Sequence, residues 1–308
     1  MAGLEPQLSI VVVLHNSAQE LVNCLRSVKP PIEAGWAELI AVDNASPDRS
    51  AEIVRGELPQ AQLISLDCNR GFAGGTNAGL SKARGRYWLL LNPDVVASPN
   101  GVEMLVHWMD AHPAIAAASP ELCADDGHCE SPGRATPSIL RTLFELSRLH
   151  RLIPAAKRAR VLRGPYWVGG DQYDAGWVPG TAMIVRPEAA RQVDLLREDL
   201  FMYGEDIEWC WRLRRGGWRI GVCSTARFVH RGGSSGGRSW GDHERERRIA
   251  AGVDAACRAM YGPAYARALA ALTGLALRLD SHGIGRGPAQ RARARDGARV
   301  WAQLARRR

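Results

Sequence analysis

The sequence predicts an α/β protein with a mostly parallel, twisted central sheet flanked by helices and followed by a C-terminal helical extension. Three observations lead to this fold class. Strand-like and helix-like stretches alternate through the first 120 residues, as in right-handed βαβ units. The early strand candidates are short and apolar along their whole length, as strands buried on both faces are. The 308 residues are enough to bury a large core.

The first part of the chain supplies strands and helices in close succession. Ser17 follows the first apolar run and suits an N-cap. Pro93 should end the fourth strand, because proline cannot donate to a sheet ladder. The expected elements are, in order, a strand at 8–14, a helix at 17–28, a strand at 38–42, a helix at 48–56, a strand at 62–66, a helix at 74–83 after a glycine-rich turn, a strand at 86–91, a helix at 99–111 and a strand at 115–119.

The alternation dissolves between residues 120 and 174, around one helical piece at 139–149. A stretch this long and irregular is typical of a lid or a binding insertion. Regular patterns return with a strand at 177–185, a helix at 205–215, strands at 218–223 and 226–229, a glycine- and serine-rich loop at 230–239 and helices from 242 to 279. We therefore expect a main domain at 1–240, with halves at 1–119 and 120–240, and a helical extension with a basic tail at 241–308.

The extension combines an apolar stripe with a basic end. The stripe predicts packing on the main domain or on a second subunit, with membrane contact as the alternative. The formal charge is +8, yet Arg286–Arg308 alone holds eight Arg and one Asp. Such a tail is typical of a solvated, partly frayed terminus or of contact with an anionic membrane or nucleic acid. The stripe consists of Tyr265, Ala268, Leu269, Leu272, Ala276 and Leu279.

The cysteines and the apolar runs indicate the cellular compartment in which the protein is expected. The seven cysteines are scattered and contain no C-x-x-C pair, which argues against a zinc site and a disulfide framework and for a reducing cytosol. The N-terminus lacks the basic region and cleavage site of a signal peptide. The apolar runs at 8–14 and 268–277 fall short of the roughly 20 residues that span a bilayer. We expect a cytoplasmic protein, with the inner face of the plasma membrane as a site of contact.

Polar clusters follow four successive strands. Because the carboxyl ends of parallel strands meet at one edge of a sheet, where ligands bind in open α/β folds, these clusters should converge. Each cluster alone is also explained by turn formation or helix capping. The clusters are His15–Asn16, then Asp43 with Asn44, Ser46 and Asp48, then Asp67 with Asn69, Arg70 and the turn at 71–77, and finally Asn92 with Asp94.

Three features of this edge suit a nucleotide and its phosphates. The Asp43 carboxylate can accept from a base imide or a ribose hydroxyl, or cap the following helix. The Gly71–Gly75 turn lets backbone approach an anion closely, although it lacks the G-x-G-x-x-G and G-K-[ST] spacings. Asp94 can hold a divalent cation that carries a diphosphate, or it merely starts a turn.

Two later clusters supply further titratable groups. Glu205 and Asp206 stand at the start of a helix, directly after Gly204. Acidic residues favour that position for electrostatic reasons alone, but adjacent carboxylates can also divide the roles of base and orienting group. His230 ends a strand before a flexible loop and can bind a metal as neutral imidazole. A lone histidine is more often structural, so His230 counts only together with Asp94.

With these residues in view, the chain resembles the family-2 glycosyltransferases, which have the nucleotide-diphospho-sugar transferase (GT-A) fold, and in particular their rhamnosyltransferase-like branch. The matching segments follow the order of the family and cover roughly residues 8–235. They are Val11–Asn16, Val42–Asp48 (VDNASPD), Asn69–Gly79 (NRGFAGGTNAG), Leu89–Val95 (LLLNPDV), Val178–Val185 (VPGTAMIV), Phe201–Leu213 (FMYGEDIEWCWRL) and Val229–Ser234.

The resemblance implies a hexosyltransferase that inverts the anomeric centre, with dTDP-L-rhamnose as the expected donor. Asp206 would be the general base, with Glu205 beside it. Asp94 and His230 would bind Mg²⁺ or Mn²⁺. The acceptor would contact Trp177, Gly180, Thr181 and Glu205, and the donor would contact His15, Asn16, Asp43, Asn69, Arg70, Gly71, Gly74, Asn77, Asn92 and Asp94.

The same resemblance implies that residues 1–119 are the half that binds the nucleotide sugar and 120–240 the half that binds the acceptor. The expected partners are a nucleotide-diphospho-sugar donor and a glycan, lipid-linked or small-molecule acceptor, without nucleic acid. Peripheral membrane contact and a homodimer through the C-terminal helices complete the expectation. The branch points to the biosynthesis of a bacterial cell wall or polysaccharide.

The chain departs from the family pattern in three places. His15 stands where an aromatic residue is usual, and Glu208–Trp209 replaces a usual Asp-Leu pair. The absence of Q-x-x-R-W after the acidic pair argues against a processive synthase. A sugar-nucleotide pyrophosphorylase is an alternative, but it would need a basic loop after the first strand. A non-catalytic relative would have little reason to keep Asp94, Asp206 and His230 together.

Overall fold

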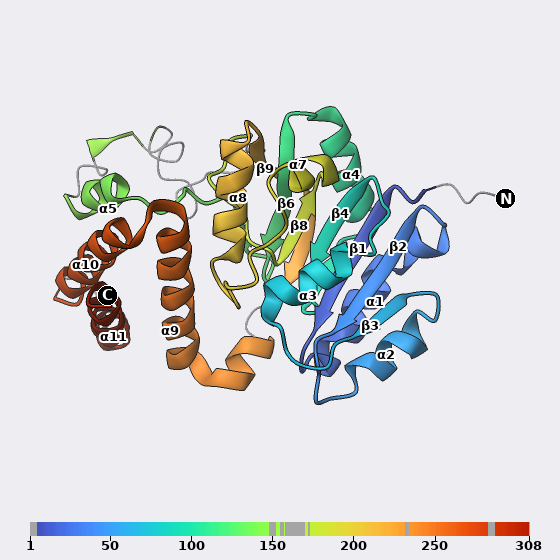
Figure 1. Ribbon diagram of the computed structural model, residues 1–308, viewed down its shortest axis with the longest axis horizontal. Helices are drawn as coiled ribbons and strands as arrows, with labels where there is room; N and C mark the ends of the chain where they lie inside the picture. The colour runs from blue at the N-terminus through green and yellow to red at the C-terminus, as the bar shows by residue number, and fades with distance from the viewer. Residues whose placement is uncertain are drawn as a thin grey trace.

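The computed structural model describes residues 5–147, 152–154, 157, 170–171, 173–231, 234–282 and 287–307 (Figure 1). In these residues one nine-stranded mixed sheet forms the centre, in the order β3-β2-β1-β4-β8-β6-β9-β5, with β7 paired to β6. The strands are β1 (Leu8–Leu14), β2 (Ala37–Asp43), β3 (Gln62–Ser65), β4 (Tyr87–Leu91), β5 (Val95–Ala97), β6 (Ile115–Cys123), β7 (Cys129–Glu130), β8 (Ala182–Val185) and β9 (Arg219–His230).

The predicted α/β fold is confirmed, and its parallel part is the first half of the sheet. Strands β3, β2, β1 and β4 pair in parallel. Strand β8 then runs antiparallel to both β4 and β6, while β6 and β9 are again parallel to each other. The sheet is therefore mixed: β8, which comes from the later half of the chain, lies antiparallel between β4 and β6.

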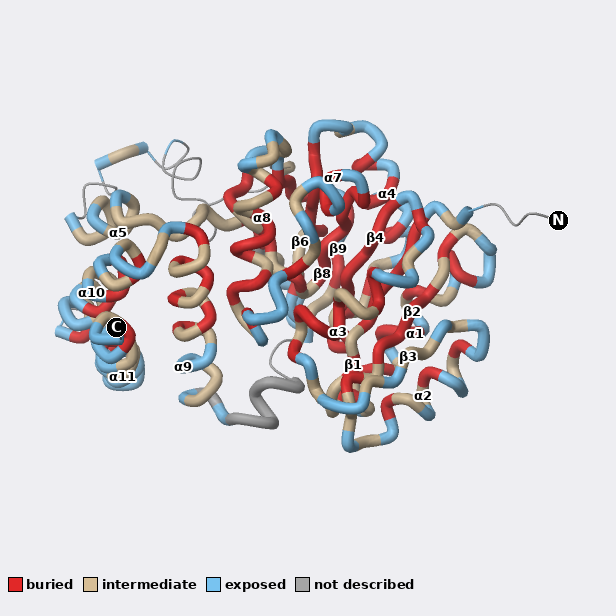
Figure 2. The backbone as a smooth tube through the Cα atoms, in the orientation of Figure 1, coloured by how far each residue is buried: buried red, intermediate tan, exposed pale blue. Residues whose placement is uncertain are grey.

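Helices cover both faces of the sheet, as the alternating side chains of β1 require. Leu8, Ile10 and Val12 point to one face and pack in a core with α1, α2 and α4. Val11 points to the other, where α3, α7 and α8 lie. The strands are accordingly buried along most of their length (Figure 2). These helices are α1 (Ala18–Glu33), α2 (Ser50–Glu57), α3 (Gly71–Leu80), α4 (Gly101–Ala111), α7 (Pro187–Gln192) and α8 (Glu205–Arg215).

The glycine-rich segment predicted as a turn is the start of α3. The helix begins at Gly71 rather than Gly74. A Cβ on Gly75 would lie 2.6 Å from a methyl group of Val13, and one on Gly79 would lie 2.4 Å from a methyl group of Val11. Gly75 and Gly79 therefore let the helix lie directly on β1, while Gly71, with a φ of 72°, turns the chain into it. Likewise, the two short strands expected at 218–229 form one strand, β9.

The C-terminal extension is made of α9 (Ser234–Tyr261), α10 (Pro263–Asp280) and α11 (Pro288–Ala305), at the opposite end of the molecule from α2 and β3 (Figure 1). The loop expected at 230–239 is helical from Ser234, and residues 232 and 233 lie outside the described chain. The basic tail is not frayed: its described residues form α11, which packs along α10.

The apolar stripe predicted on α10 is wrong in part. Leu269 is buried as expected, but Leu279 is 57% exposed and Ala268 is exposed. The buried side is instead Ala266, Leu269, Ala270 and Gly274. That side faces α11, where Ala298, Trp301 and Ala302 lie next to Gly274. Helix α5 (Ile139–Leu146) also packs on α10, through a hydrogen bond from the Ile139 amide to the Tyr265 hydroxyl.

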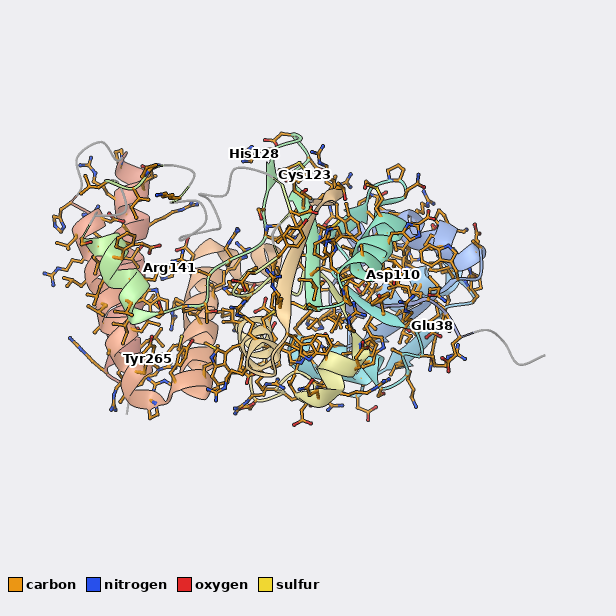
Figure 3. The ribbon with its side chains drawn as sticks, turned by 90° about the horizontal axis from the view of Figure 1, so that it is seen from above. Glu38, Asp110, Cys123, His128, Arg141 and Tyr265 are labelled. Atoms are coloured by element: carbon orange, nitrogen blue, oxygen red, sulfur yellow. A yellow bond between two sulfur atoms is a disulfide. The ribbon has the colours of Figure 1, made fainter. Side chains whose placement is uncertain are left out.

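The expectation that no disulfide forms is also wrong. Cys123 and Cys129 are directly opposite each other in the β6–β7 hairpin and are disulfide-bonded (Figure 3). Cross-strand pairing in a hairpin brings together two cysteines six positions apart, a spacing that a search for C-x-x-C misses. Within the part of the chain that the structure describes, no helix is both long and apolar enough to cross a membrane.

Candidate active site

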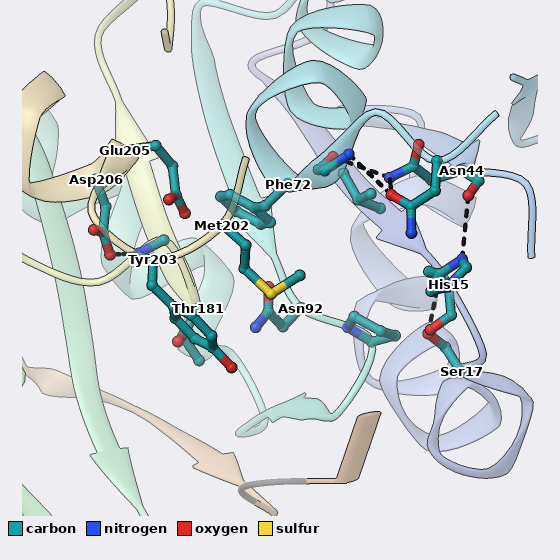
Figure 4. A pocket seen from close by; sticks show the side chains of 15 residues that line it. His15, Ser17, Asn44, Phe72, Asn92, Thr181, Met202, Tyr203, Glu205 and Asp206 are labelled. Carbon is teal, nitrogen blue, oxygen red and sulfur yellow. Dashed lines mark hydrogen bonds between the residues drawn. The ribbon is translucent and has the colours of Figure 1, made fainter. Parts of the chain in front are cut away.

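A pocket of about 190 Å³ opens at the carboxyl ends of β1 and β4, and Figure 4 shows its two sides. His15 and Asn44 form one side, and Tyr203, Glu205 and Asp206 form the other. The predicted convergence of separate polar clusters is thus observed. The pocket is lined by Val13, His15, Ser17, Asn44, Asn69, Gly71, Phe72, Asn92, Pro93, Gly180, Thr181, Met202, Tyr203, Glu205 and Asp206.

Asn44 organises the first side of the pocket. Its amide nitrogen donates to Asn69 Oδ1 over 3.1 Å and to the Gly71 carbonyl over 2.9 Å. Its own Oδ1 accepts from the Arg70 amide over 2.8 Å. Asn44 is buried, so these bonds fix the entry to α3 relative to the end of β2. The sequence places Asn44 directly after the strand, but the candidate set omitted it in favour of its neighbour Asp43.

The ends of β1 and β2 are joined by side-chain contacts to backbone amides. Asp43 Oδ1 accepts from the Ser46 amide over 2.8 Å, and Ser46 Oγ accepts from the Asn16 amide over 2.8 Å. Asp48 accepts from the Ala18 amide at the start of α1. Burial raises the Asp48 pKa, but hydrogen bonds from Ser50, Ser46 and two amides outweigh burial and lower that pKa to about 2. Asp43 and Asn16 therefore lie beside the pocket, not among its lining residues.

Three predicted donor residues, one directly before α3 and two within it, are not among the residues that line the pocket. Arg70 pairs with Glu198 at 2.6 Å. The Asn77 side chain donates to the Leu196 carbonyl at 2.8 Å and to Glu198 at 3.1 Å. Gly74 faces Arg70, whose Cβ would be 2.7 Å from a Cβ at that position. In the structure these residues fasten α3 to the segment before α8.

Asp94 and His230 lie together beyond Asn92 and Pro93. Strands β5 and β9 pair Val95 with His230, which sets the imidazole Nε2 at 3.5 Å from Asp94 Oδ2. The Asp94 side chain is only 7% exposed and His230 is 27% exposed. Neither residue lines the 190 Å³ pocket itself. The carboxylate oxygen of Asp94 suits both Mg²⁺ and Mn²⁺. The imidazole nitrogen of His230 suits Mn²⁺ better than Mg²⁺, so the pair as a whole fits Mn²⁺ best.

The acidic pair begins α8 on the other side of the pocket. Asp206 Oδ2 accepts from the Gly180 amide at 3.2 Å, and Oδ1 accepts from the Ile207 amide at 2.8 Å. Burial nevertheless raises the Asp206 pKa above its ordinary value. Glu205 is 4% exposed, and its Oε2 has no hydrogen-bond partner in the described structure. Burial, and next the charge of Asp206, raise the Glu205 pKa well above normal.

The remaining predicted acceptor residues divide between two cavities. Gly180 and Thr181 line the main pocket. Trp177 lines a neighbouring cavity of about 330 Å³ together with Pro179 and His230. The pocket also contains Phe72, Met202 and Tyr203, which were not among the candidate site residues. The sequence could have indicated these three residues by their position, because each lies within three residues of a polar residue that was predicted to be in the site.

Ligands bind at the carboxyl ends of strands in open α/β sheets, where this pocket lies, and comparison with known proteins names the family. Residues 9–157 match the family model "Glycosyl transferase family 2". Residues 9–157 are thus a family-2 glycosyltransferase domain, and the protein is a glycosyltransferase that uses a nucleotide-sugar donor.

One relative matches along most of its length. It is N-acetylglucosaminyl-diphospho-decaprenol L-rhamnosyltransferase of Mycobacterium tuberculosis, 25% identical over 260 residues, which cover 77% of this chain and 80% of the relative.

Solved structures show the GT-A fold. The chain is similar to the Pyrobaculum calidifontis mannosyltransferase PcManGT in complex with GDP-Man and Mn²⁺, with a TM-score of 0.54, 17% identity and coverage of 98% of this chain and 84% of that one. It is also similar to GalNAc-T7 with UDP, GalNAc and Mn²⁺, with a TM-score of 0.54 and 17% identity. That match covers 73% of this chain but 44% of GalNAc-T7.

Proposed function

We propose that the chain is an inverting, metal-dependent glycosyltransferase in which Asp206 is the general base. The observation that carries the proposal is that Asn92 and Pro93, which directly precede Asp94, line the same pocket as Glu205 and Asp206. Asp94, beside His230, lies at the sheet end, and the Glu205–Asp206 pair lies at the start of α8. A donor diphosphate held near the first and an acceptor hydroxyl held near the second would meet across the pocket.

The proposed reaction is a single displacement. The acceptor hydroxyl gives its proton to the Asp206 carboxylate as its oxygen bonds to the anomeric carbon, and the nucleoside diphosphate leaves from the opposite face. A raised pKa makes Asp206 a stronger base than an ordinary aspartate. A thiolate intermediate is disfavoured, since burial raises the pKa of Cys24 and raises that of Cys210 to about 12.

Asp94 and His230 would hold the metal ion, Mg²⁺ or Mn²⁺. When bound, such an ion neutralises negative charge that develops on the departing diphosphate. Support comes from the donor chemistry of the two side chains and from the Mn²⁺ named in the two structural neighbours.

The proposed donor is dTDP-L-rhamnose, with UDP- and GDP-sugars as the alternatives. The rhamnosyltransferase relative supports the choice of sugar. His15, Asn69, Gly71 and Asn92 would line the nucleotide side, with Asp43 behind them. The acceptor would enter past Gly180, Thr181 and Trp177 and present a hydroxyl of a glycan, a glycolipid or a natural product.

We also propose the division into a nucleotide-sugar half at 1–119, an acceptor half at 120–240 and a helical extension at 241–308. The extension would contact the cytoplasmic face of an anionic membrane. A groove of about 560 Å³ between α10 and α11 is lined by Arg278, Arg295, Arg299, Arg306 and His282, with Leu275 beside them. Leu275 and Leu279 are 49% and 57% exposed. Arginines that bind headgroups next to exposed leucines suit such a surface.

Vesicle flotation tests the membrane contact. The double variant R295E/R299E should lose most of its binding to phosphatidylglycerol-containing vesicles, because each basic residue near the surface contributes about 1 kcal/mol. The double variant R49E/R55E, with Arg49 directly before α2 and Arg55 within it, is the matched control and should bind like the wild type. Equal binding of the wild type to pure phosphatidylcholine vesicles and to anionic ones would remove the proposal.

A panel of dTDP-, UDP- and GDP-sugars, incubated with Mn²⁺, tests the catalytic proposal by release of the nucleoside diphosphate. We expect release from one donor and its loss in EDTA. A sugar-nucleotide pyrophosphorylase would instead consume pyrophosphate and release a nucleoside triphosphate. A non-catalytic relative would bind dTDP with Mn²⁺, seen as a raised melting temperature, without any turnover. EDTA-insensitive turnover would contradict the metal role of Asp94.

A further inference from the structure

Helix α9 of the C-terminal extension touches the turn that carries the acidic pair, backbone against backbone. Two glycines make the contact: Gly204, just before α8, and Gly252 within α9. A Cβ on Gly252 would lie 1.6 Å from the Tyr203 carbonyl oxygen. A Cβ on Gly204 would lie 2.3 Å from the Gly252 carbonyl oxygen. Only glycine lets two backbones approach this closely.

The turn itself has a conformation that needs external support. Tyr203 has a φ of 64° and Gly204 a φ of 113°, both in the left-handed region. A bulky residue such as tyrosine rarely adopts this region and persists there when its surroundings impose it. Tyr203 and Glu205 both line the pocket, so the conformation of this turn sets one wall of the site.

A second contact of α9 lies just beyond the turn. Ala256, one turn of helix after Gly252, packs with Cys257 and Met260 around Ile207 of α8. The Ala256 methyl carbon would be 3.2 Å from a Cβ on Gly204. Helix α9 therefore supports the residues on both sides of Glu205 and Asp206. Its other packing is mainly with α10 and α11.

We propose that Gly252 is a positioning residue for catalysis, and that the C-terminal extension aligns the acidic pair through it. The inference rests on the proposed function in one respect, the role of Asp206 as base. A methyl group at residue 252 must push the Tyr203 carbonyl away by more than an ångström. Misplacement of a catalytic group by about 1 Å can cost up to 10²-fold in rate. The nucleotide side, built on β1 and β2, would keep its shape.

The first test compares two helical glycines of the extension, Gly252→Ala and Gly274→Ala. A Cβ on Gly274 meets its neighbours at 3.4 Å, which is ordinary contact. We expect G252A to lower kcat for Mn²⁺-dependent donor hydrolysis about 10–100-fold. Its Kd for dTDP with Mn²⁺ should stay within about twofold of wild type, since the nucleotide side is unchanged. G274A should keep both values. A kcat for G252A within twofold of wild type would overturn the proposal.

A second pair of variants decides the matter if G252A does not fold or no longer binds dTDP. Ala256→Gly and Ala251→Gly lie on the same helix, so their cost in helix propensity is the same. Ala251 faces the α10–α11 side instead of α8. A larger loss of kcat in A256G than in A251G supports the proposal, and equal losses overturn it. Asp206→Asn in the same assay separates the role of Asp206 as base from the role of Gly252 as a positioning residue. If this variant turns over donor as fast as the wild type, only the base role is rejected.

Discussion

Two acidic sites, one just beyond the pocket and one lining it, present the same kind of side chain in different surroundings. Asp94 stands at the end of a central strand, with the His230 imidazole nitrogen 3.5 Å away. Asp206 accepts hydrogen bonds from two backbone amides, whereas one buried oxygen of the neighbouring Glu205 has no hydrogen-bond partner in the described structure. The comparison shows that the surroundings of a carboxylate determine its role. Asp94 is placed to bind a cation, and Asp206 is placed to take up a proton.

The largest effect that tests this contrast is expected from Asp206→Asn. Removing the proposed base should lower kcat by ~10²–10⁴, because an amide cannot take the acceptor proton. The asparagine side chain keeps one oxygen, so it can accept from the Gly180 amide or from the Ile207 amide but not from both. Steady-state kinetics with the preferred nucleotide sugar measures the loss. Turnover within tenfold of wild type would make the two sides indistinguishable and reject the base role.

Asp94→Asn should act on the other side, through the metal. We expect the affinity for dTDP in the presence of Mn²⁺ to fall roughly 10–100-fold, because a charged ligand becomes a neutral one. Isothermal titration with Mn²⁺ and with EDTA measures this, and in EDTA the variant should match the wild type. D206N is the control and should retain Mn²⁺-dependent binding. If both variants weakened binding equally, the division of roles would be wrong.

The pH dependence of the rate sharpens the contrast. Burial raises the Asp206 pKa, so the base becomes protonated at a higher pH than an ordinary aspartate would. Below that pKa, kcat should fall about tenfold for each pH unit. A pH–rate profile measured at saturating donor reports this group. An acid limb that starts below the ordinary aspartate pKa of about 3.9 would contradict the raised value.

The smallest effect is expected on stability, from Glu205→Gln. The folded state raises the Glu205 pKa, so the folded chain retains a proton that the unfolded chain releases near pH 4.3. Wild-type stability must therefore fall as the pH rises from that value through the folded pKa. At pH 8 the neutral glutamine should raise Tm by roughly 2–4 °C, with no gain at pH 4. A lower Tm at pH 8 would mean that the charge of Glu205 is stabilised.

The elements near the pocket illustrate what periodicity alone can reveal. Leu8–Leu14 and Glu205–Arg215 begin and end where their patterns predict, since each has one dominant period and a clear terminus. The segment from Gly71 was misjudged because glycine signals both a turn and a close approach of helix to strand. Arg70 and Asn77 were placed with the ligand-facing residues because sequence shows neighbours along the chain, not the Glu198 partner that lies 121 residues from Asn77.

The sequence alone determined the order of the strands along the chain, the polar residues that follow them and the family resemblance. The reason is that local period and chain order fix which side chains reach the edge of the sheet. Only the tertiary structure decided the disulfide between Cys123 and Cys129, the hydrogen bond from Asn77 to Glu198 and the contact of Gly252 with Tyr203. Each of these depends on register or packing between segments. A linear pattern does not contain that information, since it is set by how the elements fit together in space.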